Sequence, residues 1–140
     1  MSQITVETTV AKNIQTVWEH WTNPASIKVW SHAEDNWGVG EVANDLRVGG
    51  TFNTEMKALD GSATFNWTGT YTEVVPLQKI AYEMRDGNTV RRVSIMFEKV
   101  GEDQTKIVES FDPENTHTEE LQKAGWQLIL DNFKKFVEAH

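Results

Sequence analysis

The sequence predicts an α+β domain in which seven antiparallel strands curve around one long C-terminal helix. Three observations predict this class. One strand pattern followed by two short helical patterns opens the chain, six further strand patterns divided by turn residues occupy most of residues 42–111, and a broad apolar stripe with helical period ends it. A chain of 140 residues fits a single domain, so we expect residues 1–140 to share one core.

The opening of the chain changes period once. Residues 3–10 alternate between apolar and polar side chains, which predicts a half-buried strand. Asn13 fits the N-cap of a first short helix, and Asn23 followed by Pro24 fits the start of a second one that ends near Trp30.

The middle of the chain reads as an antiparallel sheet. Residues 31–40 are mostly polar and without a clear period, which predicts a loop before it. The paired glycines of Asp45–Phe52 mark a turn that leads into a long strand, because only glycine reaches a positive φ without steric cost. The strands are expected at residues 42–47, 50–58, 63–75, 79–86, 89–99 and 104–111, divided by turn residues such as Asp60-Gly61 and Gly101-Glu102-Asp103.

A long amphipathic helix is predicted at residues 118–139. Thr116 with Glu119 has the spacing of a capping box at its start. One broad stripe of the helix carries Leu121, Gly125, Leu128, Ile129, Asn132 and Phe136, and Trp126, Leu130, Phe133 and Val137 extend it. A helix this apolar has to lie against the sheet.

Several short motifs occur at fixed places along these elements. They are Asp45–Phe52, Val17-Trp18, Asn23-Pro24, Trp30, Gly69 with Glu73-Val74 and Pro76, and Gly125-Trp126. Together they resemble the START-like (SRPBCC) proteins related to the activator of the heat-shock protein 90 ATPase, and the resemblance runs from Thr8 to Phe136. It implies the helix-grip fold, in which a seven-stranded sheet wraps the C-terminal helix and two short helices follow the first strand.

The same resemblance implies a hydrophobic ligand cavity, since the wider superfamily includes lipid carriers, plant-hormone binders and polyketide cyclases. The eukaryotic relative uses this domain in a co-chaperone, together with a separate N-terminal domain that makes essential contacts with the chaperone. This sequence holds no such domain, so we do not expect direct activation of the ATPase.

Composition excludes several classes of function. A formal charge of −8 repels phosphate backbones, and the basic residues form pairs rather than a stripe, so nucleic acid is not an expected partner. Cysteine is absent, which rules out disulfides, thiol nucleophiles and cysteinate metal sites. The sequence shows no basic leader and no apolar run near the ~20 residues of a membrane helix. We therefore expect a cytoplasmic protein without membrane insertion.

Two motifs resemble a cofactor site and an ion site, but an ordinary loop explains each of them better. Gly38–Ala43 matches a dinucleotide fingerprint formally, but a polar loop precedes it and a strand follows, where the fingerprint needs a strand and then a helix. His32 with Glu34 and Asp35 could hold an ion or act as acid and base, although a solvated turn is the commoner outcome for such a loop cluster. We expect no cofactor and no metal.

Two polar residues are predicted to point inward from the last two strands. Glu109 shares a strand face with Thr105, Ile107 and Phe111, and Arg91 shares one with apolar residues of the preceding strand. A buried carboxylate in a cleft is a candidate ligand anchor or acid/base. A structural Arg91–Glu109 ion pair is the alternative that we favour, and a register slip of one residue would place both side chains in water.

The predicted ligand site lies between the sheet and the last helix. Aromatic residues at this spacing are explained by core packing more often than by a cofactor, yet a sheet that grips one helix readily leaves a cavity. Its expected ligand-binding residues are Trp30, Phe52, Trp67, Tyr82, Arg91, Glu109, Phe111, Trp126 and Ile129.

The hypothesis is a protein that binds a small hydrophobic or amphipathic molecule in this cavity. The first alternative is a polyketide cyclase-like enzyme in which Glu109 transfers protons, assisted by Tyr71, Tyr82 or Arg91. No serine stands in a context that predicts a nucleophile with an adjacent base. The second is a co-chaperone or interaction module that uses an exposed patch at Trp30 and Trp37. An exposed edge strand also allows a homodimer.

Overall fold

The computed structural model describes residues 3–31, 37–86 and 88–140. In these ranges a seven-stranded antiparallel sheet has the strand order β1-β7-β6-β5-β4-β3-β2. The elements are β1 (Ile4–Val10), α1 (Ile14–Thr22), α2 (Pro24–Trp30), β2 (Trp37–Asn44), β3 (Thr51–Ala58), β4 (Thr64–Val75), β5 (Lys79–Asp86), β6 (Thr89–Gly101), β7 (Gln104–Phe111) and α3 (Glu119–Glu138).

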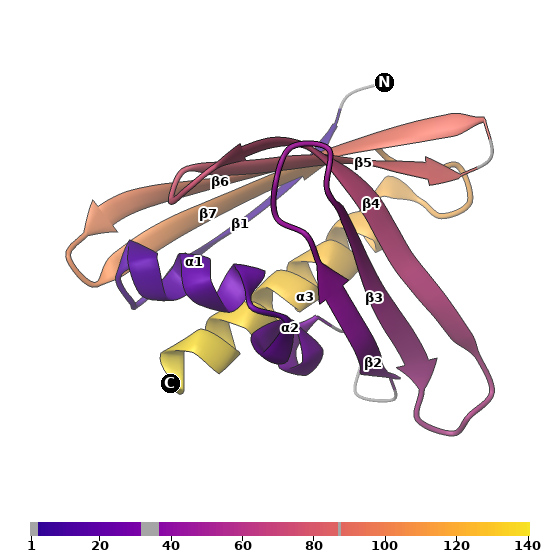
Figure 1. Ribbon diagram of the computed structural model, residues 1–140, viewed down its shortest axis with the longest axis horizontal. Helices are drawn as coiled ribbons and strands as arrows, with labels where there is room; N and C mark the ends of the chain where they lie inside the picture. The colour runs from indigo at the N-terminus through magenta and orange to yellow at the C-terminus, as the bar shows by residue number, and fades with distance from the viewer. Residues whose placement is uncertain (1–2, 32–36, 87) are drawn as a thin grey trace.

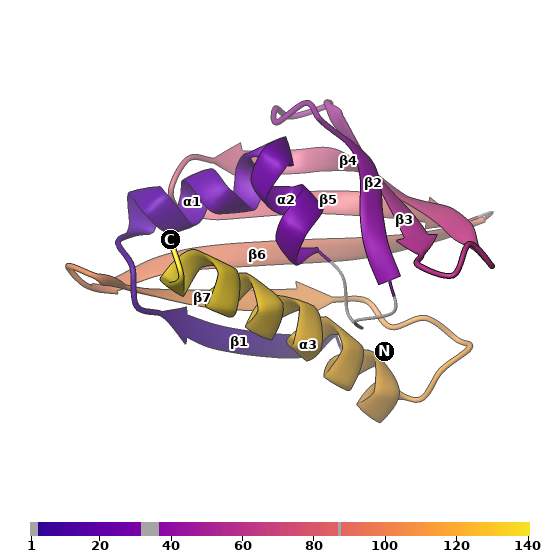
Figure 2. The same cartoon turned by 90° about the horizontal axis from the view of Figure 1, so that it is seen from below.

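The sheet curves around the helices, as the sequence predicts. All three helices lie on its concave side, while β2, β3 and β4 bend down beside them (Figure 1). Seen from below, α3 crosses the face of β7 and β1 diagonally, and α1 and α2 lie next to it (Figure 2). The predicted α+β helix-grip architecture is confirmed.

Register places two rows of side chains across the concave face. Each pair of neighbours in a row is a directly paired position on adjacent antiparallel strands, so the side chains share a face. The first row is Val6, Glu109, Ile95 and Ile80, and the second is Ile4, Phe111, Val93, Tyr82 and Tyr71. Glu109 is therefore the charged member of an otherwise apolar row.

Helix starts follow local capping chemistry. The Asn13 side chain accepts the Thr16 N–H at 2.8 Å, and Asn23 accepts the Ala25 N–H at 2.9 Å. For α3 the prediction was wrong by two residues, because Thr118, not Thr116, is the N-cap. Its hydroxyl accepts the Leu121 N–H at 3.2 Å, and no capping box forms since the third helical residue is leucine.

The glycine turn connects β2 to β3 and forms hydrogen bonds with β4. Gly49 has φ of 85°, and a Cβ at Gly50 would lie 2.1 Å from the Asp45 carbonyl oxygen, so the turn requires both glycines. The Gly49 N–H donates to the Tyr71 carbonyl at 2.9 Å, and the Tyr71 N–H donates to the Gly50 carbonyl at 2.9 Å. The turn therefore fixes the backbone of Tyr71.

The loop predicted for residues 31–40 is wrong for its last four residues, because β2 begins at Trp37 and ends at Asn44 instead of residue 47. Pairing of Trp37 with Ala58 and of Val39 with Met56 overrides the polar character of the segment. A Cβ at Gly40 would lie 2.1 Å from a carboxylate oxygen of Glu55. The glycines of the apparent dinucleotide motif thus belong to a strand with close neighbours.

One end of the concave face is tightly packed. Phe133 of α3 is fully buried, with its ring centroid 4.8 Å from those of Trp21 and Trp30. Trp18 and Trp21 meet Phe97 of β6 edge-on at 5.2 and 5.7 Å. Among the described helices, none is both long and apolar enough to cross a membrane.

Candidate functional site

The other end of the concave face encloses a cavity of about 110 Å³. Strands β2, β3, β4, β5 and β7 supply one wall, and α1, α2 and α3 supply the other. The lining residues are Trp21, Thr22, Ile27, Trp30, Ser31, Val42, Ala43, Asn44, Phe52, Thr54, Met56, Trp67, Tyr71, Ile80, Tyr82, Glu109, Trp126 and Ile129.

Glu109 is the buried carboxyl of this cavity. It is 7% exposed, and Val6 and Ile95 flank it on the neighbouring strands. Within the described residues its carboxyl makes no hydrogen bond, and burial alone raises its pKa to about 8. Every fully buried side-chain nitrogen or oxygen of the described residues has a hydrogen-bond partner, so the Glu109 oxygens keep contact with the open cavity.

Two tyrosines line the same cavity, and the hydroxyl of Tyr82 is close enough to Glu109 for their charges to interact. Burial raises the pKa of Tyr82 well above its usual value, the charge of Glu109 raises it further, and a side-chain hydrogen bond with Trp67 lowers it. Burial also raises the pKa of Tyr71 to about 12, although its hydroxyl donates a hydrogen bond to the Asn44 side chain. Both phenols therefore stay neutral at physiological pH.

Five of the fifteen other lining residues are aromatic. Phe52 meets Tyr82 edge-on with centroids 4.8 Å apart, and it lies 5.5 Å from Tyr71. Across the cavity, Trp67 of β4 meets Trp126 of α3 edge-on at 5.3 Å. A Cβ at Gly69 would lie 2.5 Å from the Phe52 ring, so the glycine leaves room for that ring.

Most of the predicted ligand-binding residues lie together on this wall. Those that do are Trp30, Phe52, Trp67, Tyr82, Glu109, Trp126 and Ile129, and the weaker catalytic candidate Tyr71 joins them. Their role in binding stays a prediction.

Arg91 and Phe111 lie outside the cavity wall. The Arg91 guanidinium donates to the Asp112 carbonyl at 3.2 Å, and its strand position is four residues from the one that pairs with Glu109. The favoured Arg91–Glu109 ion pair is therefore wrong. Phe111 is fully buried and stacks on Trp126 with centroids 3.9 Å apart, so it supports the wall from behind.

The predicted tryptophan patch does not form. Trp30 is buried, and its indole N–H donates to the His20 carbonyl at 3.0 Å. Trp37 is partly buried and meets Phe65 edge-on at 5.5 Å. The two residues therefore do not share one exposed surface.

Sequence reasoning missed several lining residues. Trp21, Asn44 and Ile80 line the cavity, but each reads as an ordinary core or turn residue. Met56 shares a strand face with Phe52, and this alternation predicts its place beside the cavity. Alternation could not reveal Asn44, since its partner Tyr71 is 27 residues away.

The described residues contain no cluster of three histidine, cysteine, aspartate or glutamate side chains suited to a metal. His20 bonds to Ser26 at 2.9 Å and packs edge-on against Phe136. The predicted group of His32, Glu34 and Asp35 lies outside the described residues.

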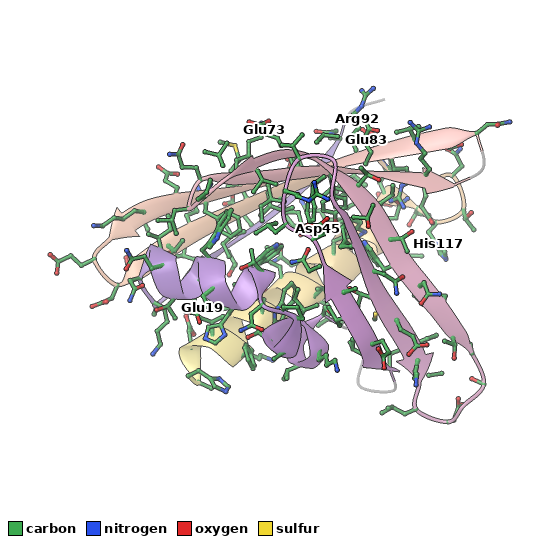
Figure 3. The ribbon with its side chains drawn as sticks, in the orientation of Figure 1. Glu19, Asp45, Glu73, Glu83, Arg92 and His117 are labelled. Carbon is green, nitrogen blue, oxygen red and sulfur yellow. The ribbon has the colours of Figure 1, made fainter. Side chains whose placement is uncertain are left out.

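Other charged residues lie on the outside. Figure 3 shows Glu73, Glu83 and Arg92 on the side of the sheet opposite the helices. Arg92 lies 4.0 Å from Glu83, and Lys79 pairs with Glu73 at 3.1 Å. Ion pairs on the surface contribute little to stability. Because these cations lie on the outer face of the sheet, they do not compensate the charge of Glu109 on the inner face.

Comparison with known proteins agrees with this architecture. The AHSA1-like protein from Aeromonas hydrophila is 41% identical over 98% of this chain and 92% of its own, with a TM-score of 0.89. Chr148 from Cytophaga hutchinsonii is 47% identical with the same coverage and a TM-score of 0.83. CV1439 from Chromobacterium violaceum is 21% identical over 99% of both chains, with a TM-score of 0.86, and shares the fold.

No curated protein matches the chain. The model of the family described as "Activator of Hsp90 ATPase homolog 1-like protein" matches residues 12–138, which include every element from α1 to α3. This protein belongs to the Activator of Hsp90 ATPase homolog 1-like family.

Proposed function

We propose that this protein binds a small amphipathic molecule in the cavity between the sheet and α3. The observation that carries the proposal is the Glu109 carboxyl, which has no hydrogen-bond partner among the described residues and lies at the wall of a mainly apolar, aromatic-lined space. Apolar cavities with a few placed polar groups are typical of small-molecule sites. A side chain that served only to fill the core would be better replaced by a hydrocarbon.

The cavity volume limits the size of the ligand. About 110 Å³ is below the roughly 300–1,000 Å³ of pockets for drug-sized ligands and close to the ~150 Å³ of a cavity that binds benzene. The volume favours a molecule with one ring over a fatty acid or a flavonoid. A polar group on such a ring would face Glu109 or Tyr82.

Native mass spectrometry of freshly purified protein, compared with its denatured mass, tests for a retained ligand. Tryptophan fluorescence titration with single-ring aromatics, flavonoids and fatty acids then tests for binding, because the cavity wall contains four tryptophans, Trp21, Trp30, Trp67 and Trp126. We expect saturable quenching by single-ring compounds. The absence of both a retained mass and any response would contradict the proposal.

Two substitutions on neighbouring residues of α3 provide a matched control. Ile129→Phe adds a ring inside the cavity, whereas Leu128→Phe adds the same ring at a position that is 40% exposed and outside it. Binding should fall at least tenfold in the first variant, as about 1.4 kcal/mol of lost contact predicts, and stay unchanged in the second. Equal effects would place the ligand elsewhere.

A second candidate function is proton transfer to a bound substrate. A carboxyl with a pKa of about 8 exchanges its proton readily near neutral pH, as a general acid or base must. Glu109→Gln would then abolish turnover while sparing the binding of neutral substrate, whereas an unchanged rate would exclude this function.

A further inference from the structure

Glu109 is the single charged residue of the cavity wall, counted over the part of the chain that the structure describes. The other lining residues are apolar, aromatic, hydroxyl-bearing or amide-bearing, and none is lysine, arginine or histidine. When Glu109 ionises, its charge has no counter-ion from the protein within the cavity. A buried carboxylate without a counter-ion is costly in free energy. A ligand that carries positive charge would offset the negative charge of Glu109 and so bind more favourably.

The arginine predicted to pair with Glu109 is already engaged. Arg91 donates its Nε–H to the Asp112 carbonyl and stays outside the cavity wall, and Arg92 lies on the outer face of the sheet near Glu83. The chain as a whole carries a formal charge of −8, which attracts cations and repels anions. Both the local and the global field therefore favour a positively charged ligand.

The aromatic wall favours the same ligand. Trp67, Trp126, Phe52, Tyr71 and Tyr82 line the same cavity as Glu109. The faces of such rings carry negative electrostatic potential and attract ammonium groups, most strongly for tryptophan. A carboxylate combined with several rings is a suitable environment for a quaternary or protonated amine with a small apolar substituent.

We propose that the ligand is a small organic cation, an ammonium group attached to about one ring or a short alkyl chain, whose charge pairs with Glu109 among these aromatic faces. This inference rests on the proposed function and names its ligand class. The ammonium group replaces the missing counter-ion, and the hydrocarbon part fills the apolar remainder of the cavity.

Ionisation of Glu109 links such binding to pH. The titratable groups that face it are Tyr82 of β5 and Tyr71 of β4, both neutral below about pH 10 because burial raises their pKa values. Arg91 of β6 acts on Tyr82, while β1 and α3 present Val6, Trp126 and Ile129. The free carboxyl has a pKa of about 8, so affinity for a permanent cation should rise by up to about tenfold per pH unit toward pH 8 and level off above it.

Two compounds of matched shape test the inference. Phenyltrimethylammonium carries a permanent positive charge, and tert-butylbenzene is its neutral counterpart. Isothermal titration calorimetry of the intact protein at pH 9 should show that the cation binds at least tenfold more tightly than tert-butylbenzene. At pH 6 this difference in affinity between the two compounds should shrink. The affinity for tert-butylbenzene should be no higher at pH 9 than at pH 6.

Glu109→Gln removes the charge and keeps the shape. The variant should lose most of the affinity for phenyltrimethylammonium and its pH dependence, and should retain tert-butylbenzene. If the variant does not fold, the pH profile of the unmodified protein gives the answer by itself. Equal binding of the two compounds at pH 9, or a cation affinity that does not change with pH, would overturn the inference.

The outcomes separate this inference from the proposed function. Binding of tert-butylbenzene without binding of the cation would overturn the ligand class and leave the cavity as a neutral-ligand site, with protonated Glu109 donating a hydrogen bond. Failure of both compounds together with an unresponsive panel of other ligands would overturn both proposals.

Discussion

Both ends of the concave face are rich in aromatic residues, yet one is tightly packed and the other is hollow. At the packed, solid end Phe133 contacts the rings of Trp21 and Trp30 and has no exposed surface. At the hollow end Phe52, Trp67 and Trp126 border about 110 Å³ of open space. Trp21 and Trp30 divide the two regions, since each contacts Phe133 and lines the cavity.

The difference between the two regions is polar, not aromatic. Phe133 packs against the rings of Trp21 and Trp30, while the cavity wall also holds Glu109, Tyr71 and Tyr82. Aromatic excess alone therefore does not identify a site, because packing uses it equally well. A buried carboxyl that no group of the described residues compensates is what makes the hollow region the candidate site.

The largest effect on stability should follow from removing a buried ring at the solid end. Phe133→Ala removes a fully buried ring and should lower the free energy of unfolding by about 3–5 kcal/mol, because its close-packed neighbours cannot collapse into the gap. Urea denaturation followed by circular dichroism measures the loss. Phe52→Ala, which removes a partly buried ring beside the cavity, should cost less than half as much. Equal losses would mean that the two regions are packed alike.

The next effect concerns the pH dependence of stability. The folded-state pKa of Glu109, about 8, lies above its ordinary value of 4.5, so the folded protein holds this proton more tightly than the unfolded chain. Stability from this group is present in full below about pH 4.5, falls as pH rises, and is lost above about pH 8.

Urea denaturation between pH 5 and pH 9 should therefore show a decline of about 2–4 kcal/mol that Glu109→Gln abolishes. Two other carboxyls do not interfere, because the pKa values of Glu114 and Glu138 are lowered, chiefly by hydrogen bonds with His117 and Lys134, and their effects lie at more acidic pH. A flat profile in the unmodified protein would show that Glu109 is solvated and not buried.

The sequence predicts the solid region better than the hollow one. Alternation and helical period place Val10, Ile95, Ile107 and Phe133 in the core correctly, because each local pattern agrees with the fold. Alternation also turns Glu109 inward correctly. What it cannot provide is the relative position of strands, and the wrong Arg91–Glu109 pair follows from that missing register.

The hollow region depends on contacts between distant segments. The pairing of Trp37 with Ala58 forms the first half of β2, although the local sequence resembles a loop. The hydrogen bond from Tyr71 to Asn44 exists only because the Gly49-Gly50 turn brings β4 beside the end of β2. No periodicity within one segment contains this information.

That turn provides the third prediction. Gly50→Ala would place a Cβ 2.1 Å from the Asp45 carbonyl oxygen, so the backbone must shift, and we expect a loss of about 1–3 kcal/mol. Since Gly50 accepts the Tyr71 N–H, the shift should also reach the cavity wall and weaken ligand binding. Thermal unfolding and fluorescence titration measure the two effects. Lost stability with unchanged binding would show that the turn supports the fold and not the site.

The smallest effect should come from the glycine of α3, and its sign is opposite. A Cβ at Gly125 meets nothing within 4 Å, and the residue has an ordinary helical environment, so Gly125→Ala should raise the free energy of unfolding by about 0.5–1 kcal/mol. Gly125 precedes Trp126 but does not line the cavity, so ligand affinity should stay constant. If the ligand affinity of this variant fell while its free energy of unfolding rose, Gly125 would border the path by which the ligand enters beside Trp126. The hollow region would then extend along α3 toward solvent.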